Sequence, residues 1–458
     1  MTIRPVSVAI ALAGAMAMLS AGQSRAQESI EQEEATPSSV HQSLNEIERI
    51  FRPPPPPRIA LFPQLREQLK YAPPFFRDSQ LDVNLRSYYR NKTSSVGDKS
   101  EAWAGGGSVT FRSGWLLDFM SMGTAFYTSQ PLYAPKDRDG TDLLKPGQQG
   151  YSALGQLYAR FKVTEANYLT VGRYILDTPY ISRDDGKMSP NTFQGYVLQG
   201  TAGGGDNQAA FRYGAGYIDK IKEKNSDAFV SMSQSAGANV DRGVAAAGAL
   251  YTAGQFSFGA IDYYSSDIIN IAYGETKYTT GIAGWFDVLF GAQYVDQRSV
   301  GADLLNGSGF STNEFGARAE LGREGAILTF AYSKAGAGAK LQNPWSGNPF
   351  YTSTIVAGFK NAGEQALVAK LSYDFTGVGL EGVTAYALYA RGWTNAIAAG
   401  APLTEDEFDI DLQWRPRSEP LGGLWLRSRC GFSKVDQGGT LNHLRDCRLI
   451  ANYDFSIY

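Results

Sequence analysis

Histidine, the side chain that most often carries proton transfer near neutral pH, occurs only twice in this chain, as His41 and His443. A Ser-His-carboxylate site needs an ordered histidine within reach of a nucleophile, and neither histidine has such a neighbour in a recognisable pattern. Two solvated surface histidines are the simpler interpretation. Nucleophilic catalysis of this kind is therefore not expected, and a hydrolase is the most distant of the three functions that we weigh.

Carboxylate chemistry is harder to set aside, because three carboxylates alternate along one segment. Glu407, Asp409 and Asp411 are two residues apart and would share one face of a strand. A carboxylate pair can act as general acid and general base. Three like charges this close also need positive partners, and arginines follow in the sequence at positions 415, 427 and 429. We expect charge balance with these arginines rather than catalysis.

No metal or cofactor site is predicted. The run from Asp137 to Asp142 has part of the spacing of a calcium-binding loop but lacks the distal glutamate, so a solvated loop is favoured over a bound ion. The glycine-rich stretches 105–107 and 203–205 lack the strand-to-helix context of a phosphate-binding loop. We therefore expect neither a metal nor an organic cofactor.

The elements that would position these side chains are β-strands. From residue 81 onward, apolar and polar residues alternate, and the alternation recurs at 103–111, 408–414 and 424–432. Short turns alternate with long polar segments such as 129–150. At the usual number of residues per strand and its connection, residues 81–458 give about 18 strands. The pattern predicts an all-β fold, a transmembrane antiparallel β-barrel with short periplasmic turns, and a secreted β-sandwich is the alternative.

The first eighty residues differ from the rest. Residues 1–26 have an early arginine, an apolar run and a small-residue cleavage site, which predict a signal peptide and a mature chain that starts at Gln27. Residues 27–80 form a proline-rich periplasmic leader, with helical spacing at 40–51 and five consecutive prolines at 53–57. The leader is either a disordered segment or an arm that contacts a periplasmic partner.

Net charge limits the partners. The formal charge is −3 and the pI is near 5.7, so there is no basic excess for binding nucleic acid. No run after the signal peptide is long and apolar enough for a transmembrane helix. The expected partners are the lipids of the bacterial outer membrane and small solutes. A monomer and a loose trimer both remain open.

A long segment between two predicted strands, at 175–191, is expected to constrict the barrel. It is too long for a hairpin connection and carries two prolines and charges of both signs. Folded inward, it would narrow the lumen and place these charges in the path of a solute. The residues assigned to this constriction loop are Asp177, Tyr180, Ser182, Asp184 and Asp185.

Four segments resemble the OprD family of substrate-specific outer-membrane porins. They are LRSYYRN at 85–91, PYISRDDGKMSPNTFQG at 179–195, EFDIDLQWRP at 407–416 and LWLRSRCGF at 424–432. Their order and spacing carry the likeness, which extends with gaps from about Leu81 to Tyr458 and does not include the leader. The resemblance implies the same strand count. It also implies that basic residues on one wall face acidic and hydroxyl groups of the constriction loop, and that solutes carry a carboxylate.

A basic ladder is expected on the lumen wall. The resemblance places Arg86, Arg427 and Arg429 on it, and strand alternation alone adds Arg160, Lys162 and Arg448. The expected function is passive, substrate-specific transport of small carboxylates such as amino acids and organic or aromatic acids. A general diffusion porin is the second choice. The sequence does not distinguish one carboxylate from another.

The last hairpin has a predicted register. Gly438-Gly439 is a candidate two-residue turn, which sets Cys430 opposite Cys447, within reach of a disulfide in an oxidising compartment. The same register sets Arg429 opposite Arg448. Because like charges so placed disfavour a strand pair, the cluster indicates a role in solute passage. The structural alternative is that a water-filled lumen softens the repulsion and that Asp409 or Asp411 of the preceding strand partly neutralises the arginines.

Overall fold

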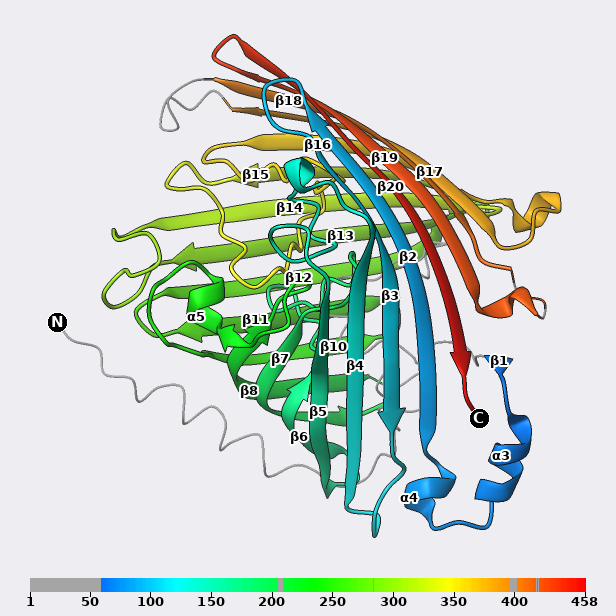
Figure 1. The fold of residues 1–458 in the computed structure, drawn as a ribbon. Coiled ribbons are helices and arrows are strands. Elements are labelled where there is room, and N and C mark those ends of the chain that lie inside the picture. Colours follow the sequence, from blue (N-terminus) through cyan, green and yellow to red (C-terminus); the bar gives the residue numbers. More distant parts are fainter. Residues whose placement is uncertain (1–58, 205–208, 283, 395–401, 417, 419) are drawn as a thin grey trace.

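A closed antiparallel β-barrel makes up most of the computed structural model (Figure 1). The structure describes residues 59–204, 209–282, 284–394, 402–416, 418 and 420–458. The predicted signal peptide, the predicted helix at 40–51 and the proline run at 53–57 lie outside these residues.

Eighteen long strands form the wall within the described residues, and the last of them, β20, pairs with the first, β2. Their bounds are β2 Gln80–Ser94, β3 Ser100–Arg112, β4 Met120–Tyr133, β5 Tyr151–Thr164, β6 Asn167–Tyr174, β7 Thr192–Gly203, β8 Ala210–Lys222, β10 Val244–Ala253, β11 Phe256–Ser265, β12 Ile269–Ile282, β13 Phe286–Arg298, β14 Ser311–Arg323, β15 Ala326–Ala335, β16 Gln365–Asp374, β17 Val383–Thr394, β18 Leu403–Trp414, β19 Leu424–Gln437 and β20 Thr440–Ser456. The β2–β20 pairing leaves no open sheet edge in the membrane. The fold class predicted from alternation is confirmed.

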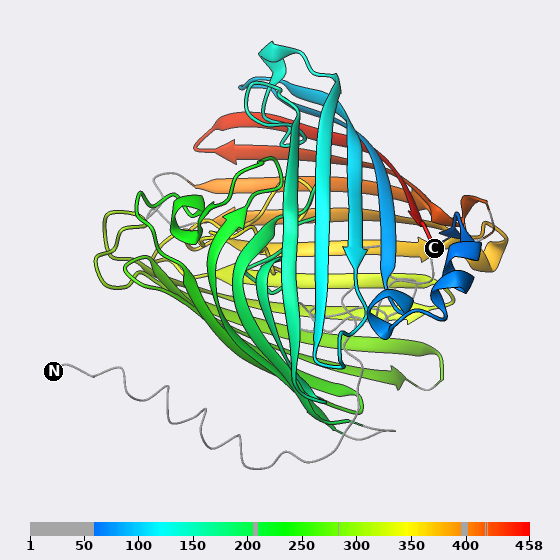
Figure 2. The same ribbon diagram turned by 60° about the horizontal axis from the view of Figure 1, so that its bottom comes forward.

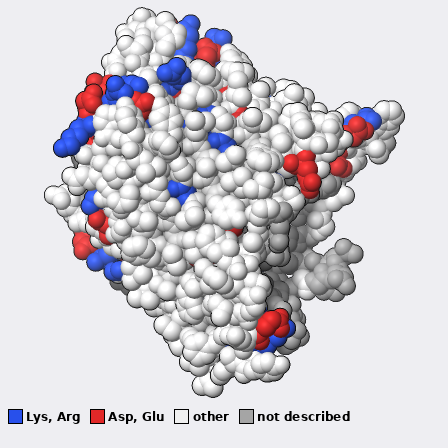
Figure 3. Space-filling view, turned by 45° about the vertical axis from the view of Figure 1, so that its right-hand side comes forward, with Lys and Arg blue, Asp and Glu red and all other residues white. Residues whose placement is uncertain are grey.

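Each strand has one side toward lipid and one toward the lumen. On β18, Phe408, Ile410 and Leu412 are exposed by 43%, 47% and 50%, whereas Glu407 and Asp411 are almost fully buried. Apolar side chains that would form the core of a soluble protein therefore cover the outside, as a membrane barrel requires. In Figure 3, charged side chains gather mainly near the edges of the view, and a broad area of the face carries few.

The two ends of the barrel differ in their connections. Connections at the end that carries the C-terminus are short, such as 165–166, 254–255 and 324–325. The longest connections, 134–150, 175–191, 223–243 and 336–364, all lie at the other end. Figures 1 and 2 show the short helix α5 at this far end, opposite the C-terminus. By the usual rule for such barrels, the long loops are extracellular.

The alternation expected along 151–163 is interrupted in β5. A register shift relative to β4 leaves Gly155 as an extra residue, because Ala125 pairs with Gln156 and Phe126 pairs with Leu154. This β-bulge puts Tyr151 on the lumen side and Leu157 on the lipid side, whereas unbroken alternation would put both on one face. A side chain at Gly155 would meet the Tyr127 ring, so the bulge needs glycine here.

The last part of the leader is folded against the periplasmic end of the barrel. The two-residue strand β1 Ile59–Ala60 pairs in parallel with the end of β20, and the helices α3 Pro63–Leu69 and α4 Pro74–Arg77 follow. The backbone N–H of Gly114 donates to the Phe75 carbonyl at 2.9 Å. The other short elements are β9 Val230–Ser231, α5 Met232–Ser235, η3 Lys136–Arg138, η4 Phe375–Val378 and η6 Leu421–Gly423. No helix among the described residues is long and apolar enough to cross a membrane.

Candidate pore constriction

Three extracellular loops fold into the barrel and pack together. Ile181 of loop 175–191 forms an isolated β-bridge with Ser346 of loop 336–364. The indole Nε1 of Trp345 donates to the Met232 carbonyl of loop 223–243 at 3.0 Å. These loops and wall strands between β5 and β15 enclose an apolar cluster in which Tyr180 and Trp345 have no exposed surface. The narrowing therefore involves more than the single loop predicted from the sequence, and Tyr180 anchors its loop instead of lining an open pore.

The constriction loop is tied to the opposite wall through Arg86 of β2. Its Nη1 donates to Oδ1 of Asp185 at 2.7 Å, and its Nη2 donates to Oδ2 at 3.2 Å. The same guanidinium donates from Nε to the amide oxygen of Asn452 on β20 at 2.8 Å. The side chains of Arg86 and Asp185 are only 5% and 10% exposed. The ladder and the acidic loop, which were expected to face each other across the lumen, are thus in direct contact here.

Two further ladder arginines share one carboxylate. Asp411 of β18 lies 2.8 Å from Nη2 of Arg427 and 3.2 Å from Nε of Arg429, both on β19. The Nη2 of Arg429 also donates to the hydroxyl of Tyr386 at 3.1 Å. Asp411 has no exposed surface. Two guanidinium groups therefore surround a single negative charge.

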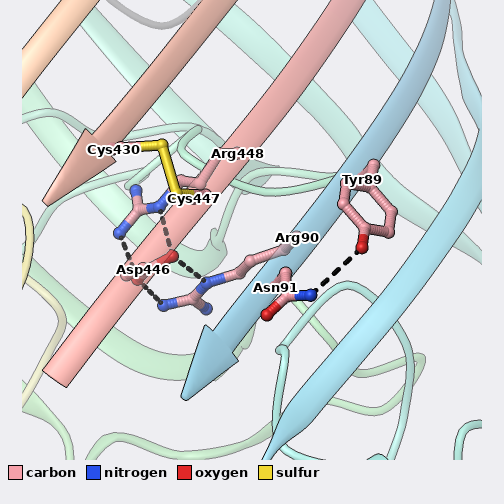
Figure 4. The surroundings of a disulfide bond; sticks show 7 residues. All are labelled: Tyr89, Arg90, Asn91, Cys430, Asp446, Cys447 and Arg448. Atoms are coloured by element: carbon pink, nitrogen blue, oxygen red, sulfur yellow. Dashed lines mark hydrogen bonds and ion pairs between the residues drawn. A yellow bond between two sulfur atoms is a disulfide. The ribbon is translucent and has the colours of Figure 1, made fainter. Parts of the chain in front are cut away.

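A similar arrangement recurs two strands further, at Asp446 of β20 (Figure 4). Arg90 of β2 donates from Nη2 to Oδ2 of Asp446 at 2.7 Å, and Arg448 donates from Nη2 to the same oxygen at 3.0 Å. Arg90 and Arg448 pair directly across β2 and β20, as do Arg448 and Arg429 across β20 and β19. Arg90 was not among the predicted site residues, although it lies four residues after Arg86 on the same strand face.

Two residues assigned to the ladder lie elsewhere. Arg160 of β5 stacks on the ring of Tyr168, with its Cζ 4.4 Å from the ring centroid. The Nζ of Lys162 pairs with Asp118 at 2.6 Å, in the turn that precedes β4 at the periplasmic end. The adjacent strands β2, β19 and β20 carry the other four predicted ladder residues, Arg86, Arg427, Arg429 and Arg448. Arg160 and Lys162 lie on β5, on a different part of the wall.

The remaining acidic loop residues bind groups other than the ladder. The hydroxyl of Ser182 donates to Oδ1 of Asp177 at 3.1 Å, and Arg183 approaches Oδ2 of Asp177 at 3.5 Å. Asp184 forms an ion pair with Lys224 of the neighbouring loop. Among the predicted loop residues, Asp185 contacts the ladder directly, and the others stabilise the fold of the loops.

Glu407 and Asp409 hold loop 336–364 against the wall. Glu407 accepts the backbone N–H of Val356 at 2.8 Å and that of Ala357 at 2.6 Å, and Asp409 accepts that of Ile355 at 3.1 Å. Of the three carboxylates of β18 that were expected to balance the arginines, Asp411 pairs with Arg427 and Arg429, whereas Glu407 and Asp409 bind backbone N–H groups of the loop. Arg415 instead stacks over Trp425 at 4.2 Å.

Lys187 of the constriction loop was not among the predicted site residues. It is 6% exposed. Burial lowers the pKa of its ammonium group to about 7. The positive charges of Arg90, Arg448 and Lys224 act in the same direction, and Asp184 opposes them. A lysine that titrates near neutral pH therefore lies beside the ladder.

The last hairpin has the register expected from its glycine pair. Gln437 pairs with Thr440 across Gly438 and Gly439, whose φ values of 59° and 87° lie in the left-handed region that a tight hairpin turn of this kind needs. Cys430 pairs with Cys447, and a disulfide joins them (Figure 4). The bond lies on the lipid side of the strands whose lumen side carries Arg429 and Arg448.

Carboxylates of the 137–142 run have protein partners. Asp139 accepts the backbone N–H of Gly147, and Asp142 approaches Arg90 at 3.4 Å. Within the described part of the chain, no group of three or more His, Cys, Asp or Glu residues could hold a metal ion. His443 is exposed on β20.

Comparison with known proteins identifies the family. Residues 73–457 match the family model described as outer membrane porin, OprD family. This chain belongs to the OprD family of outer membrane porins. It is 24% identical to the porin-like protein GalP of Pseudomonas putida strain KT2440 over 84% of this chain and 93% of that protein. Members of this family are channels of the bacterial outer membrane, not enzymes.

Solved OprD-type porins share the fold at low sequence identity. Pseudomonas aeruginosa OccK9 (OpdG) has a TM-score of 0.74 and 22% identity, with 84% of this chain and all of that chain covered. OpdK of the same organism, solved with vanillate, has a TM-score of 0.72 and 21% identity over 83% of this chain and all of its own. A BenF-like porin from Pseudomonas fluorescens Pf-5 has a TM-score of 0.74 and 18% identity over 83% and 99%.

Proposed function

We propose that this OprD-family porin is substrate-specific and passes small solutes that carry a carboxylate, such as amino acids, small organic or aromatic acids and short peptides. The observation that supports this most is the clustering of guanidinium groups on one wall. Asp411 stands between Arg427 and Arg429, and Asp446 stands between Arg90 and Arg448. In both groups two guanidinium groups converge on one buried aspartate, and Arg90 also approaches the more exposed Asp142 at 3.4 Å, so a solute carboxylate can join or replace the resident carboxylates as a guanidinium partner.

The geometry suits passage rather than tight binding. One row of residues paired across β2, β20 and β19 consists of Arg90, Arg448 and Arg429. On β19, Arg427 lies two residues from Arg429 on the same face. A solute carboxylate can exchange between neighbouring guanidinium groups, each of which offers charge-assisted hydrogen bonds. Several weak sites in succession allow a solute to enter and to leave. The resident aspartates weaken each site, which favours fast release.

The apolar side of the constriction suits organic acids. The buried cluster around Tyr180 and Trp345 holds in place the loops that face the charged wall. OpdK, one of the structural relatives, was solved with vanillate, an aromatic carboxylate. An aromatic or aliphatic acid could place its carboxylate on the ladder and its apolar part against the loops.

Liposome swelling tests the proposal. Proteoliposomes are exposed to pairs of solutes of matched size, one an organic carboxylate and the other an uncharged sugar. A substrate-specific carboxylate porin passes the acid faster than the sugar. Permeation that follows size alone would support the general diffusion porin instead.

A further inference from the structure

The lipid-facing wall has a groove at the seam where the barrel closes. It has a volume of about 580 Å³ and crosses strands β18, β19, β20, β2 and β3. Known small-molecule sites fall roughly between 300 and 1,000 Å³. The groove opens to the outside of the barrel, so it is separate from the solute path.

Small residues in register produce the groove. Ala451 pairs with Ser87, and Ser87 pairs with Gly105, which leaves a shallow row between larger neighbours. The adjacent row contains Ser428 beside Leu449. The strands alternate without a bulge here, so these short side chains face the lipid.

Large apolar side chains form the two ends of the groove. Trp414 and Leu426 stand at one end and Trp103 at the other, and they are 37%, 37% and 44% exposed. The indole Nε1 of Trp103 donates to the hydroxyl of Ser87 at 2.8 Å, so these polar atoms are already satisfied within the groove. The surface is therefore suited to a flexible hydrocarbon chain, and it is continuous with the lipid-facing band of the barrel.

Two partly exposed cations lie at the extracellular end of the groove. Tyr89 lines the groove, and its hydroxyl donates to Glu101. Glu101 also pairs with Lys99, whose Nζ lies 2.8 Å away, and with Arg138 of loop 134–150. Arg138 also lies 3.9 Å from Asp137, whose side chain is 80% exposed, so the two cations are shared between one nearly buried and one exposed carboxylate. The side chains of Lys99 and Arg138 are 38% and 34% exposed, so an anionic headgroup can reach them.

We propose that this groove is a binding site for one anionic, phosphorylated lipid of the outer membrane, with an acyl chain between Trp103 and Trp414 and its phosphate beside Lys99 and Arg138. A second copy of the barrel fits less well, because two convex barrels meet along their protruding side chains and would leave a groove between bulky ends empty.

Native mass spectrometry of the full protein, released from nanodiscs, tests the site. The probes are dioleoylphosphatidylglycerol, which is anionic, and dioleoylphosphatidylethanolamine, which has no net charge. The variant Ser428→Leu/Ala451→Leu fills the groove, and Arg138→Gln removes a cation at its end. The matched controls are Ala260→Leu, on the lipid face of β11, and Arg298→Gln, an exposed arginine paired with Asp296.

The wild type is expected to retain one phosphatidylglycerol molecule. The groove-filling variant loses it by about tenfold, and Arg138→Gln loses the preference for phosphatidylglycerol over phosphatidylethanolamine. Both controls behave as the wild type, and solute flux stays unchanged in every variant that folds. Equal lipid retention in the wild type and the groove-filling variant would overturn the proposal. So would loss of an oligomer without loss of lipid, because a second copy would then be the occupant.

Discussion

The guanidinium of Arg86, on the first barrel strand, forms a two-point ion pair with the carboxylate of Asp185 in the constriction loop, with distances of 2.7 and 3.2 Å. This pair joins the loop to the wall on which the other ladder arginines lie. Because both side chains are nearly buried, losing one partner leaves an uncompensated charge and costs about 3–5 kcal/mol locally.

Asp185→Asn is therefore expected to loosen the constriction loop. Single-channel recordings should show a higher open conductance and more current noise than the wild type. Asp227→Asn is the control, because Asp227 pairs with Lys145 at the exposed surface between two loops. If the open conductance and the current noise of Asp185→Asn equal those of the wild type, the other loop contacts alone hold the constriction.

Ion selectivity should depend on pH through Lys187. Its pKa near 7 means that the ammonium is charged at pH 6 and largely neutral at pH 8. A charge gained beside Arg90 and Arg448 attracts anions, so reversal potentials should shift toward anion selectivity as the pH falls. Lys187→Met should remove this step, and Lys99→Met should keep it. A step that survives in Lys187→Met would assign the titration to another group.

The same group links stability to pH. Since the pKa of Lys187 is lowered on folding from 10.5 to about 7, the unfolded chain binds more protons between these values. The free energy of unfolding should therefore rise as the pH rises from about 7 to 10.5. In Lys187→Met this rise should be smaller, as measured by urea unfolding at several pH values.

Glu407 should be needed to hold loop 336–364 in the lumen. It accepts two backbone N–H groups of that loop, and each hydrogen bond to a charged group is worth roughly 1.5–3 kcal/mol. Glu407→Ala should expose residues 354–357 to faster hydrogen exchange and raise the conductance. Asp406→Ala, on the lipid side of the same strand, should change neither. Equal exchange in both variants would contradict the assigned role.

The disulfide should be present in the exported protein. Non-reducing peptide mapping is expected to find Cys430 joined to Cys447. For a closed loop of this size the bond is worth about 3 kcal/mol in the chain-entropy model. Cys430→Ala/Cys447→Ala should still fold but unfold at lower urea. Two free thiols in the exported wild type would contradict the assignment.

The strands and the last hairpin could be predicted because they depend on local sequence. Alternation fixes which side of a strand faces lipid, and the Gly438-Gly439 turn sets the pairing of Cys430 with Cys447. The bulge at Gly155 could not be predicted, because an extra residue changes the face only through pairing with β4. Alternation also placed Lys162 on the lumen side, but it did not indicate the position of this residue along the barrel axis, which is near the periplasmic end.

Contacts between loops depend on side chains that are distant in sequence. Trp345 meets Met232 and Ile181 meets Ser346 across more than a hundred residues, and composition contains no sign of either contact. The burial of Lys187 follows from the same packing. Arg90 was within reach of sequence reasoning, since it lies on the same strand face as Arg86, but its shared partner Asp446 appears only once β2 and β20 are paired.

The role of the arginine ladder is the central claim, and flux through Arg427→Gln/Arg429→Gln tests it most directly. The matched control is Arg298→Gln/Arg323→Gln, which removes two positive charges from exposed arginines outside the ladder. Swelling rates for a small organic carboxylate and for an uncharged sugar of equal size are measured in the wild type and both variants. We predict that the ladder variant loses carboxylate flux by about tenfold while sugar flux and the control stay as in the wild type. An unchanged ratio of carboxylate to sugar flux in the ladder variant would contradict the account and leave a general diffusion porin.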